Sequence, residues 1–144
     1  MKLNGRVIFP GEVVAEALVT QMKISFYGGV DPESGIILEK GHELEGKCIS
    51  GKILVFPTGK GSTVGSYTLY RLKLNGKSPA AIINAESDPI TAVGCIISEI
   101  PCIDQIPIER LQSGNVLKID SAASNVILMD PQSDIELTQE ISSQ

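Results

Sequence analysis

The residues best suited to chemistry lie in one glycine-rich segment, PTGKGSTVGS, at residues 57–66. Three glycines and Lys60 separate an apolar run, ILVF, from a helix-like stretch that opens near Ser62 and Thr63. A loop of this kind presents backbone N–H groups at the positive end of a helix, where an anion can be held. The pattern is equally typical of a tight turn without a ligand, so the segment alone leaves both interpretations open.

Two nucleotide-binding patterns are excluded in this segment. A Walker A loop needs Gly, four further residues, then Gly-Lys-Ser/Thr. Here Gly61 follows the Gly-Lys pair in place of Ser or Thr, and Leu54 occupies the position of the first glycine. A dinucleotide fingerprint fails as well, because Gly65 comes one residue too late after the Gly-x-Gly pair. The loop therefore does not predict nucleotide hydrolysis or dinucleotide binding.

A Ser-His-Asp triad would have to use His42, because the chain has one histidine. His42 stands in a polar stretch, GHELEG, and is predicted to be a solvated loop residue. Swivelling domains that carry a phosphohistidine share the strand–loop–helix order, but they place a histidine where this chain has Ser62. From the residues alone, Ser62 or Thr63 is predicted to cap the helix that follows, to face an anion, or to do both.

The three cysteines, Cys48, Cys95 and Cys102, form no Cys-x-x-Cys pair. An odd count without such a pair disfavours a disulfide framework. Free cysteines are among the most frequently buried residues. All three are therefore predicted to be buried, inert thiols.

Composition favours one domain and excludes several classes of protein. The chain has 144 residues, of which 42% are hydrophobic and 20% charged. Its net charge of −5 and the lack of a basic run disfavour a nucleic-acid binder. No apolar run approaches the roughly 20 residues of a membrane span, and the N-terminus lacks an apolar segment of signal length. We expect a cytoplasmic protein that contacts neither nucleic acid nor membrane.

The elements that must position the loop are short. Strands are predicted where apolar runs are bounded by turn residues, at 3–9, 13–20, 53–56, 80–85, 102–108, 116–120 and 126–130. One helix is predicted over 64–76, with Tyr67, Tyr70 and Leu74 on one face, and a second from Asp88-Pro89 to a point before Pro101. Strands alternating with helices favour an α/β fold with a partly parallel sheet, whose ligands lie beyond the C-terminal ends of its strands. The loop at 57–63 stands at such an end.

Four segments, in this order, resemble the small subunit of the aconitase X family: GRVIFPGEVVAEALV, SFYGGVDPESGIIL, LEGKCISGKILVFPTGKGSTVGSYTLY and GKSPAAIINAESDPITAVGCII. The combination of FYGGVDP, PTGKGSTVGS and AAIINAESDPI carries the resemblance, which spans roughly residues 4–130. It implies a swivelling β/β/α domain over residues 1–130, similar to the mobile domain of aconitase. Residues 131–144 are then a polar, acidic C-terminal tail.

The resemblance also implies an activity and a partner. A separate large subunit is expected to carry a [4Fe-4S] cluster and most of the substrate pocket, with no metal bound by this chain alone. The archaeal two-subunit members dehydrate (R)-5-phosphomevalonate, a phosphorylated hydroxy acid, to trans-anhydromevalonate 5-phosphate in a mevalonate pathway towards isoprenoids. Related members dehydrate cis-3-hydroxy-L-proline. A stand-alone module that binds an anion or phosphometabolite through the same loop is the alternative of a different class.

On the same resemblance, Ser62 is the proton acceptor of the dehydration. Serine is a poor base in water, so its alkoxide needs positive potential nearby, which a helix start and Lys60 would supply. Lys60 is expected to pair with the substrate carboxylate or phosphate, or else to be a solvated loop residue. Gly61 and Thr63 are expected to contact the substrate through the loop. Gly29 is assigned to a second loop near the pocket or to a structural turn.

Overall fold

Two parallel strands, each four residues long, form the centre of the computed structural model, which describes residues 1–129. β4 (Ile53–Phe56) and β5 (Ala81–Asn84) are buried at every position. Alternate residues of β4 pack into different hydrophobic cores. Leu54 and Phe56 belong to one cluster of buried side chains, and Ile53 and Val55 belong to another. Apart from Asn84 at the end of β5, both strands are continuous apolar runs, as expected where a sheet is covered on both faces.

Within the described residues the sheet has eight strands in the order β1-β8-β7-β3-β4-β5-β6-β2. The remaining strands are β1 (Lys2–Asn4), β2 (Arg6–Phe9), β3 (Val13–Val19), β6 (Cys102–Asp104), β7 (Val116–Asp120) and β8 (Asn125–Met129). The pairs β3–β4, β4–β5 and β5–β6 are parallel, and the other neighbouring pairs are antiparallel. The predicted α/β fold with a partly parallel sheet is confirmed.

The sheet closes on itself at Gly5. β1 and β2 stand at opposite ends of the strand order, yet Gly5 alone separates them in the chain. The N–H of Gly5 donates to the Ser124 carbonyl at 2.9 Å, and a Cβ here would overlap the Asp104 carbonyl oxygen. The prediction of one strand over 3–9 was wrong, because the chain changes partner from β8 to β6 at this residue and leaves no room for a side chain.

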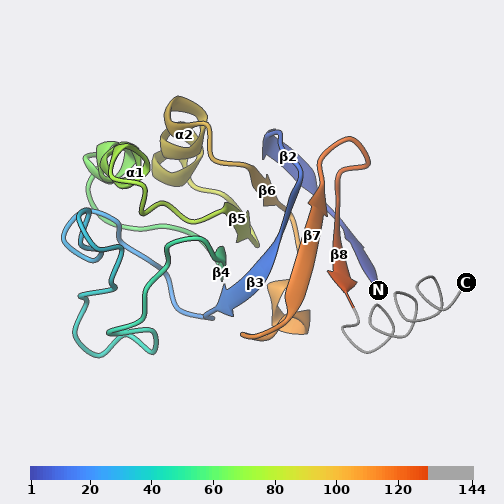
Figure 1. Cartoon of the computed structure of the whole chain (residues 1–144), viewed down its shortest axis with the longest axis horizontal. Coiled ribbons are helices and arrows are strands. Elements are labelled where there is room, and N and C mark those ends of the chain that lie inside the picture. The colour runs from blue at the N-terminus through green and yellow to red at the C-terminus, as the bar shows by residue number, and fades with distance from the viewer. Residues whose placement is uncertain (130–144) are drawn as a thin grey trace, which may run out of the picture.

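Two helices lie on one face of the sheet (Figure 1). α1 (Gly65–Leu74) connects β4 to β5, and α2 (Pro89–Ser98) connects β5 to β6. They approach closely at Gly94, where a Cβ would overlap Cδ1 of Leu69. Beneath them, the rings of Phe26 and Phe56 pack edge to face at 5.8 Å. Neither helix is long and apolar enough to cross a bilayer, and none other within residues 1–129 is.

One further predicted strand needs correction. The strand predicted over 102–108 ends at Asp104, because Gln105 has a φ of 62° and Pro107 offers no N–H to a ladder. A 3-10 helix (Ile108–Arg110) follows instead. The face of α1 formed by Tyr67, Tyr70 and Leu74 points outward, whereas Leu69 and Leu72 are the buried apolar side chains of that helix. The tail predicted at 131–144 lies outside the described residues.

Candidate functional site

The glycine-rich loop leaves the C-terminal end of β4 and is held at its base by two separate segments. Gly59 forms a parallel bridge with Ile24, and the Lys60 N–H donates to the Ile24 carbonyl at 3.0 Å. On the other side, the Gly59 N–H donates to Oδ1 of Asp88 at 2.8 Å. A Cβ on Gly59 would lie 2.6 Å from that same carboxylate oxygen. The loop therefore has a fixed base and an exposed tip.

Ser62 lies at this exposed tip, just before α1. Its Oγ accepts a hydrogen bond from the Val64 N–H at 3.2 Å, and its carbonyl accepts from the Gly65 N–H at 2.9 Å. The prediction that Ser62 or Thr63 is the N-cap was wrong, since Val64 occupies that position and makes no side-chain cap. Ser62 instead forms a local turn before the helix. Its Oγ still faces the positive end of the helix dipole.

Gly61 and Gly29 are brought together by a residue that the sequence did not single out, Ser25. Gly61 has a φ of 94°, and a Cβ on it would lie 2.5 Å from the Ser25 Oγ. A Cβ on Gly29 would overlap the Ser25 carbonyl oxygen. Ser25 Oγ itself donates to the Tyr27 carbonyl at 3.1 Å. The segment around Ser25 and the glycine-rich loop are thus neighbours, and the contact of Gly29 is a local one within the turn that begins at Ser25.

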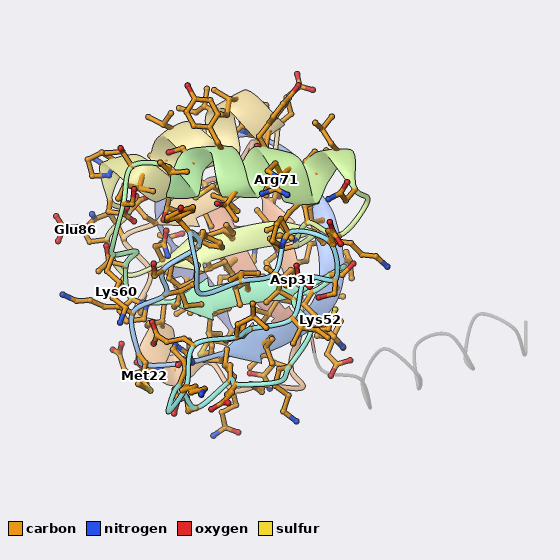
Figure 2. All side chains as sticks on the ribbon, turned by 90° about the vertical axis from the view of Figure 1, so that its left-hand side faces the viewer. Met22, Asp31, Lys52, Lys60, Arg71 and Glu86 are labelled. Carbon is orange, nitrogen blue, oxygen red and sulfur yellow. The ribbon has the colours of Figure 1, made fainter. Side chains whose placement is uncertain are left out.

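Lys60 projects from the side of the molecule (Figure 2) and pairs with Glu39. Its Nζ lies 3.1 Å from Glu39 Oε1, and its side chain is 46% exposed. The ammonium group is therefore both solvated and partly neutralised. An incoming anion would have to replace Glu39 as its partner. Nothing in the sequence indicated Glu39, which comes from a distant loop.

Thr63 lines an apolar groove of about 300 Å³ between the two helices. Its other lining residues are Ser66, Tyr67, Pro89, Ile90, Val93 and Ile97. The groove opens beside the loop tip, because Thr63 is the neighbour of Ser62 in the chain. An exposed serine thus adjoins an apolar surface.

Asp88 is the N-cap of α2, as the sequence predicted, and it has a second role. Its Oδ2 accepts from the N–H groups of Ile90 and Thr91 at 3.0 and 3.1 Å. Its Oδ1 accepts from the Gly59 N–H. One carboxylate therefore joins the start of α2 to the base of the glycine-rich loop.

An ion pair supports the segment that leads to Asp88. Arg6 donates to both carboxylate oxygens of Asp104, at 3.0 and 2.8 Å, and the Ser87 N–H donates to Oδ2 at 2.9 Å. Burial by itself would raise the pKa of Asp104, but the hydrogen bonds from Arg6 and Ser87 outweigh burial and lower it. Asp104 therefore stays ionised.

His42 is buried, and its prediction as a solvated loop residue was wrong. Its Nδ1 accepts from the Leu44 N–H at 3.0 Å, and its Nε2 lies 3.1 Å from the Lys23 carbonyl oxygen. This pairing requires a neutral ring with the proton on Nε2. The side chain is 5% exposed and joins two loop segments. Its role is structural.

The cysteines of this chain do not fit an iron–sulfur cluster. Cys95 and Cys102 are buried as predicted, whereas Cys48 is exposed, contrary to prediction, and donates to the Ser34 carbonyl. The hydrogen bond with Cys102 and burial raise the pKa of the Cys95 thiol well above its usual range. Cluster ligands are thiolates, so this buried pair is poorly suited to the task. Residues 1–129 contain no group of three His, Cys, Asp or Glu placed to hold a metal ion.

Comparisons with known proteins place the chain among close relatives. A family model described as the aconitase X swivel domain matches residues 2–129. The chain is 50% identical over 135 residues to the phosphomevalonate dehydratase small subunit of Methanosarcina acetivorans, covering 92% of this chain and 94% of that protein. It is 46% identical to the protein of the same name from Thermococcus kodakarensis, covering 90% and 98%. The crystal structure of Thermococcus kodakaraensis aconitase X (holo-form) superposes with a TM-score of 0.89 at 45% identity, covering 90% of this chain and 99% of that one.

Proposed function

The chain belongs to the aconitase X swivel-domain family, and we infer from this membership that it is the small subunit of a phosphomevalonate dehydratase, a hydro-lyase. The observation that carries this conclusion is an identity of 50% across nearly the whole length of both chains. A match of that extent does not depend on one shared module within a longer protein. The substrate proposed is (R)-5-phosphomevalonate, and the product is trans-anhydromevalonate 5-phosphate.

A small subunit implies a large one, and we propose that the large subunit holds most of the substrate pocket and the iron–sulfur cluster. Two observations support this division. The cysteines of this chain do not fit a cluster, and the Thermococcus aconitase X structure is of a holo-form, which implies a cofactor in the family. Ser62 is also exposed, whereas a base works best where water is excluded. The partner would supply that exclusion.

Ser62 is the proposed base. The dehydration removes a proton from the carbon next to the substrate carboxylate, forms the carbon–carbon double bond and breaks the bond to the leaving hydroxyl. Ser62 Oγ, as alkoxide, would take that proton. The Val64 N–H already donates to this oxygen at 3.2 Å, and the start of α1 adds positive potential. Both favour the charged form that the step requires.

The other loop residues would bind substrate. Lys60 is proposed to exchange Glu39 for a carboxylate or phosphate of the substrate, since its ammonium is the cation nearest the loop tip in sequence. Ser25 fills the space beside Gly61 and Gly29, so these two glycines would contact the substrate only through their backbone. Thr63 would border the pocket on the side of the helices.

The test uses this chain co-expressed anaerobically with its large subunit. We expect the purified complex to convert (R)-5-phosphomevalonate to the anhydro product. Ser62→Ala should lower turnover by at least about a hundredfold, the scale of a lost general base, while gel filtration shows the complex intact. Val14→Glu, near the start of β3, serves as the control and should keep wild-type turnover.

Three results would change this conclusion. An assembled, cluster-loaded complex that leaves phosphomevalonate untouched would move the search to other hydroxy acids, beginning with cis-3-hydroxy-L-proline. Full activity in Ser62→Ala would remove Ser62 as the base but keep the enzyme assignment. Saturable binding of inorganic phosphate by the isolated chain, with no association to a large subunit, would favour a stand-alone anion-binding module.

A further inference from the structure

We propose that the outer surface of the two helices is where the large subunit docks, so that docking and covering of the base happen together. This surface, the α1–α2 face, is defined by six apolar side chains: Val64, Tyr67, Tyr70, Val93, Ile96 and Ile97. The proposal rests on the proposed function, since it takes the large subunit as the partner. It adds the surface that binds this partner, which membership of the family does not specify.

The first observation is exposure. The six side chains have exposed fractions from 41% for Tyr70 to 65% for Tyr67. Single exposed apolar residues are ordinary on a protein surface, but a contiguous group of them marks an interaction site. The two helices pack against each other at Gly94 and lie side by side (Figure 1), and Tyr67, Val93 and Ile97 line one groove between them. Leu74, at the end of α1, is also exposed, and the exposed apolar side chains outside the two helices, such as Val14 on β3, lie on other segments.

The second observation is the lack of charge. α2 has the sequence PITAVGCIIS, in which no residue is charged. A helix with one face in solvent normally carries charged or polar residues on that face. The outer positions of α2 are instead Val93, Ile96 and Ile97. Depletion of charge together with apolar and aromatic side chains is the composition of the buried centre of a protein interface.

The third observation is shape. The groove of about 300 Å³ between the helices has walls from both, including Tyr67 on one side and Val93 and Ile97 on the other. A space of this size accepts one or two apolar side chains of a partner. Anchoring side chains seated in such pockets carry most of the binding energy of an interface. The occupant should therefore present an apolar or aromatic anchor rather than a charged one.

The fourth observation selects the partner. Thr63 lines the groove and is adjacent to Ser62, so a protein seated on the α1–α2 face also covers the exposed Ser62. The proposed reaction requires the large subunit to do this, because its pocket must meet the base. The interface and the active site are then one continuous surface. A second copy of this chain would cover the same base without bringing a substrate pocket.

The experiment measures binding of the large subunit to Val93→Glu and Ile97→Glu by calorimetry, with Val14→Glu as the matched control. Val93 and Val14 are 48% and 59% exposed, so the same substitution is made at similar exposure. Val14 is paired in register with Lys118 of β7, a lysine that can form an ion pair with the introduced glutamate. We expect at least about tenfold weaker binding for each α2 variant and less than about a twofold change for the control. Thermal melts of the isolated variants should match wild type.

Wild-type affinity in both α2 variants would overturn the docking proposal. Ser62→Ala, measured alongside, separates the two proposals: tight binding without turnover keeps the enzyme assignment even if the docking surface is wrong. Failure of wild type to bind the large subunit would overturn both. Sedimentation of the isolated chain tests the other occupant. A dimer that Val93→Glu dissociates, with large-subunit binding unchanged, would assign the face to self-association and overturn the proposal.

Discussion

Ser25 sets the distance between the two loops of the candidate site. The missing side chains of Gly61 and Gly29 make room for it, because a Cβ at either position would overlap one of its oxygens. At Gly61 a second constraint applies, since its φ of 94° lies in the left-handed region that favours glycine. The backbone that carries Ser62 is therefore specified by steric fit one residue before the base.

Gly61→Ala should destabilise the fold and lower turnover together. Strain at a positive φ costs about 1–3 kcal/mol, and the contact with Ser25 Oγ adds to it by pushing the loop away. We expect a fall in the thermal midpoint and a reduced kcat for the complex with the large subunit.

The matched control is Gly46→Ala. Gly46 has a φ of 82° but nothing within 4 Å of a Cβ, so it reports the cost of backbone strain alone. It should lower the thermal midpoint less than Gly61→Ala and leave kcat unchanged. Equal effects of the two substitutions on kcat would mean that Ser25 does not position the loop.

The sequence predicted the loop and its position better than the partners of its residues. The loop stands out through local signals, three glycines and a lysine after an apolar strand. Its contacts with Asp88 and Glu39 come from segments far along the chain, 29 positions away in the case of Gly59 and Asp88. The burial of His42 was missed for the same reason, since its ring Nε2 pairs with the carbonyl oxygen of Lys23, which is 19 positions away in the sequence. Residue type predicts local geometry, but partners depend on the fold.

At the scale of elements, Asp88 connects the two strand–helix units of the site. Its Oδ2 accepts hydrogen bonds from the first free N–H groups of α2, and its Oδ1 accepts from the N–H of Gly59 in the loop. The glycine-rich loop and the start of α2 are thus held together by one carboxylate. Because α2 also forms half of the proposed docking surface, a shift of this helix would displace the base.

Asp88→Asn should separate these two functions of the carboxylate. The amide keeps one acceptor oxygen, so it can serve either α2 or Gly59 but not both. Loss of a cap or of one such hydrogen bond costs about 1 kcal/mol. We expect a lower urea midpoint and a reduced kcat with little change in KM.

Glu86→Gln is the control, since Glu86 is exposed in the same segment and loses the same charge. It should match wild type in both measurements. A kcat for Asp88→Asn equal to that of Glu86→Gln would show that the link to Gly59 does not affect the base.

The order of helices and strands was predictable because an apolar run bounded by glycine, proline or aspartate can form few structures other than a short strand or helix. The helix start at Asp88-Pro89 and the stop at Asn75-Gly76 were both confirmed. Which face of α1 is buried was not predictable, because Tyr67, Tyr70 and Leu74 have the spacing of a core stripe. The proposed docking of the large subunit on the α1–α2 face would account for the exposure of Tyr67 and Tyr70.

At the scale of the whole molecule, one seam holds the sheet closed. Arg6 on β2 faces Asp104 on β6 in register, and their paired side chains fasten the N-terminal segment at one end of the strand order. Asp104 is fully buried. Its carboxylate also accepts a hydrogen bond from the Ser87 N–H, so Asp104 joins β2 to the segment that leads to Asp88.

Acid should weaken this seam. The pKa of Asp104 is lowered in the folded protein, so its contribution to stability is present above the unfolded value of about 4 and is lost as pH falls from there through the lowered pKa. The urea midpoint should therefore decline below about pH 4. In Arg6→Gln the carboxylate loses a partner that lowers its pKa, so we expect a lower midpoint at neutral pH and a shallower decline in acid. If the urea midpoint fell with pH in the same way in wild type and in Arg6→Gln, Asp104 would not be the group responsible for the loss of stability in acid.

Closure at Gly5 also decides how copies of this chain meet in solution. An open sheet offers rows of unpaired N–H and C=O groups, which can template a strand from another molecule and lead to fibres. Here the N-terminal segment occupies both ends of the strand order and reduces such edges to short stretches. What the described chain exposes instead is side-chain surface on two helices. Contacts between copies through that surface would not require strand pairing, the route that leads to fibres.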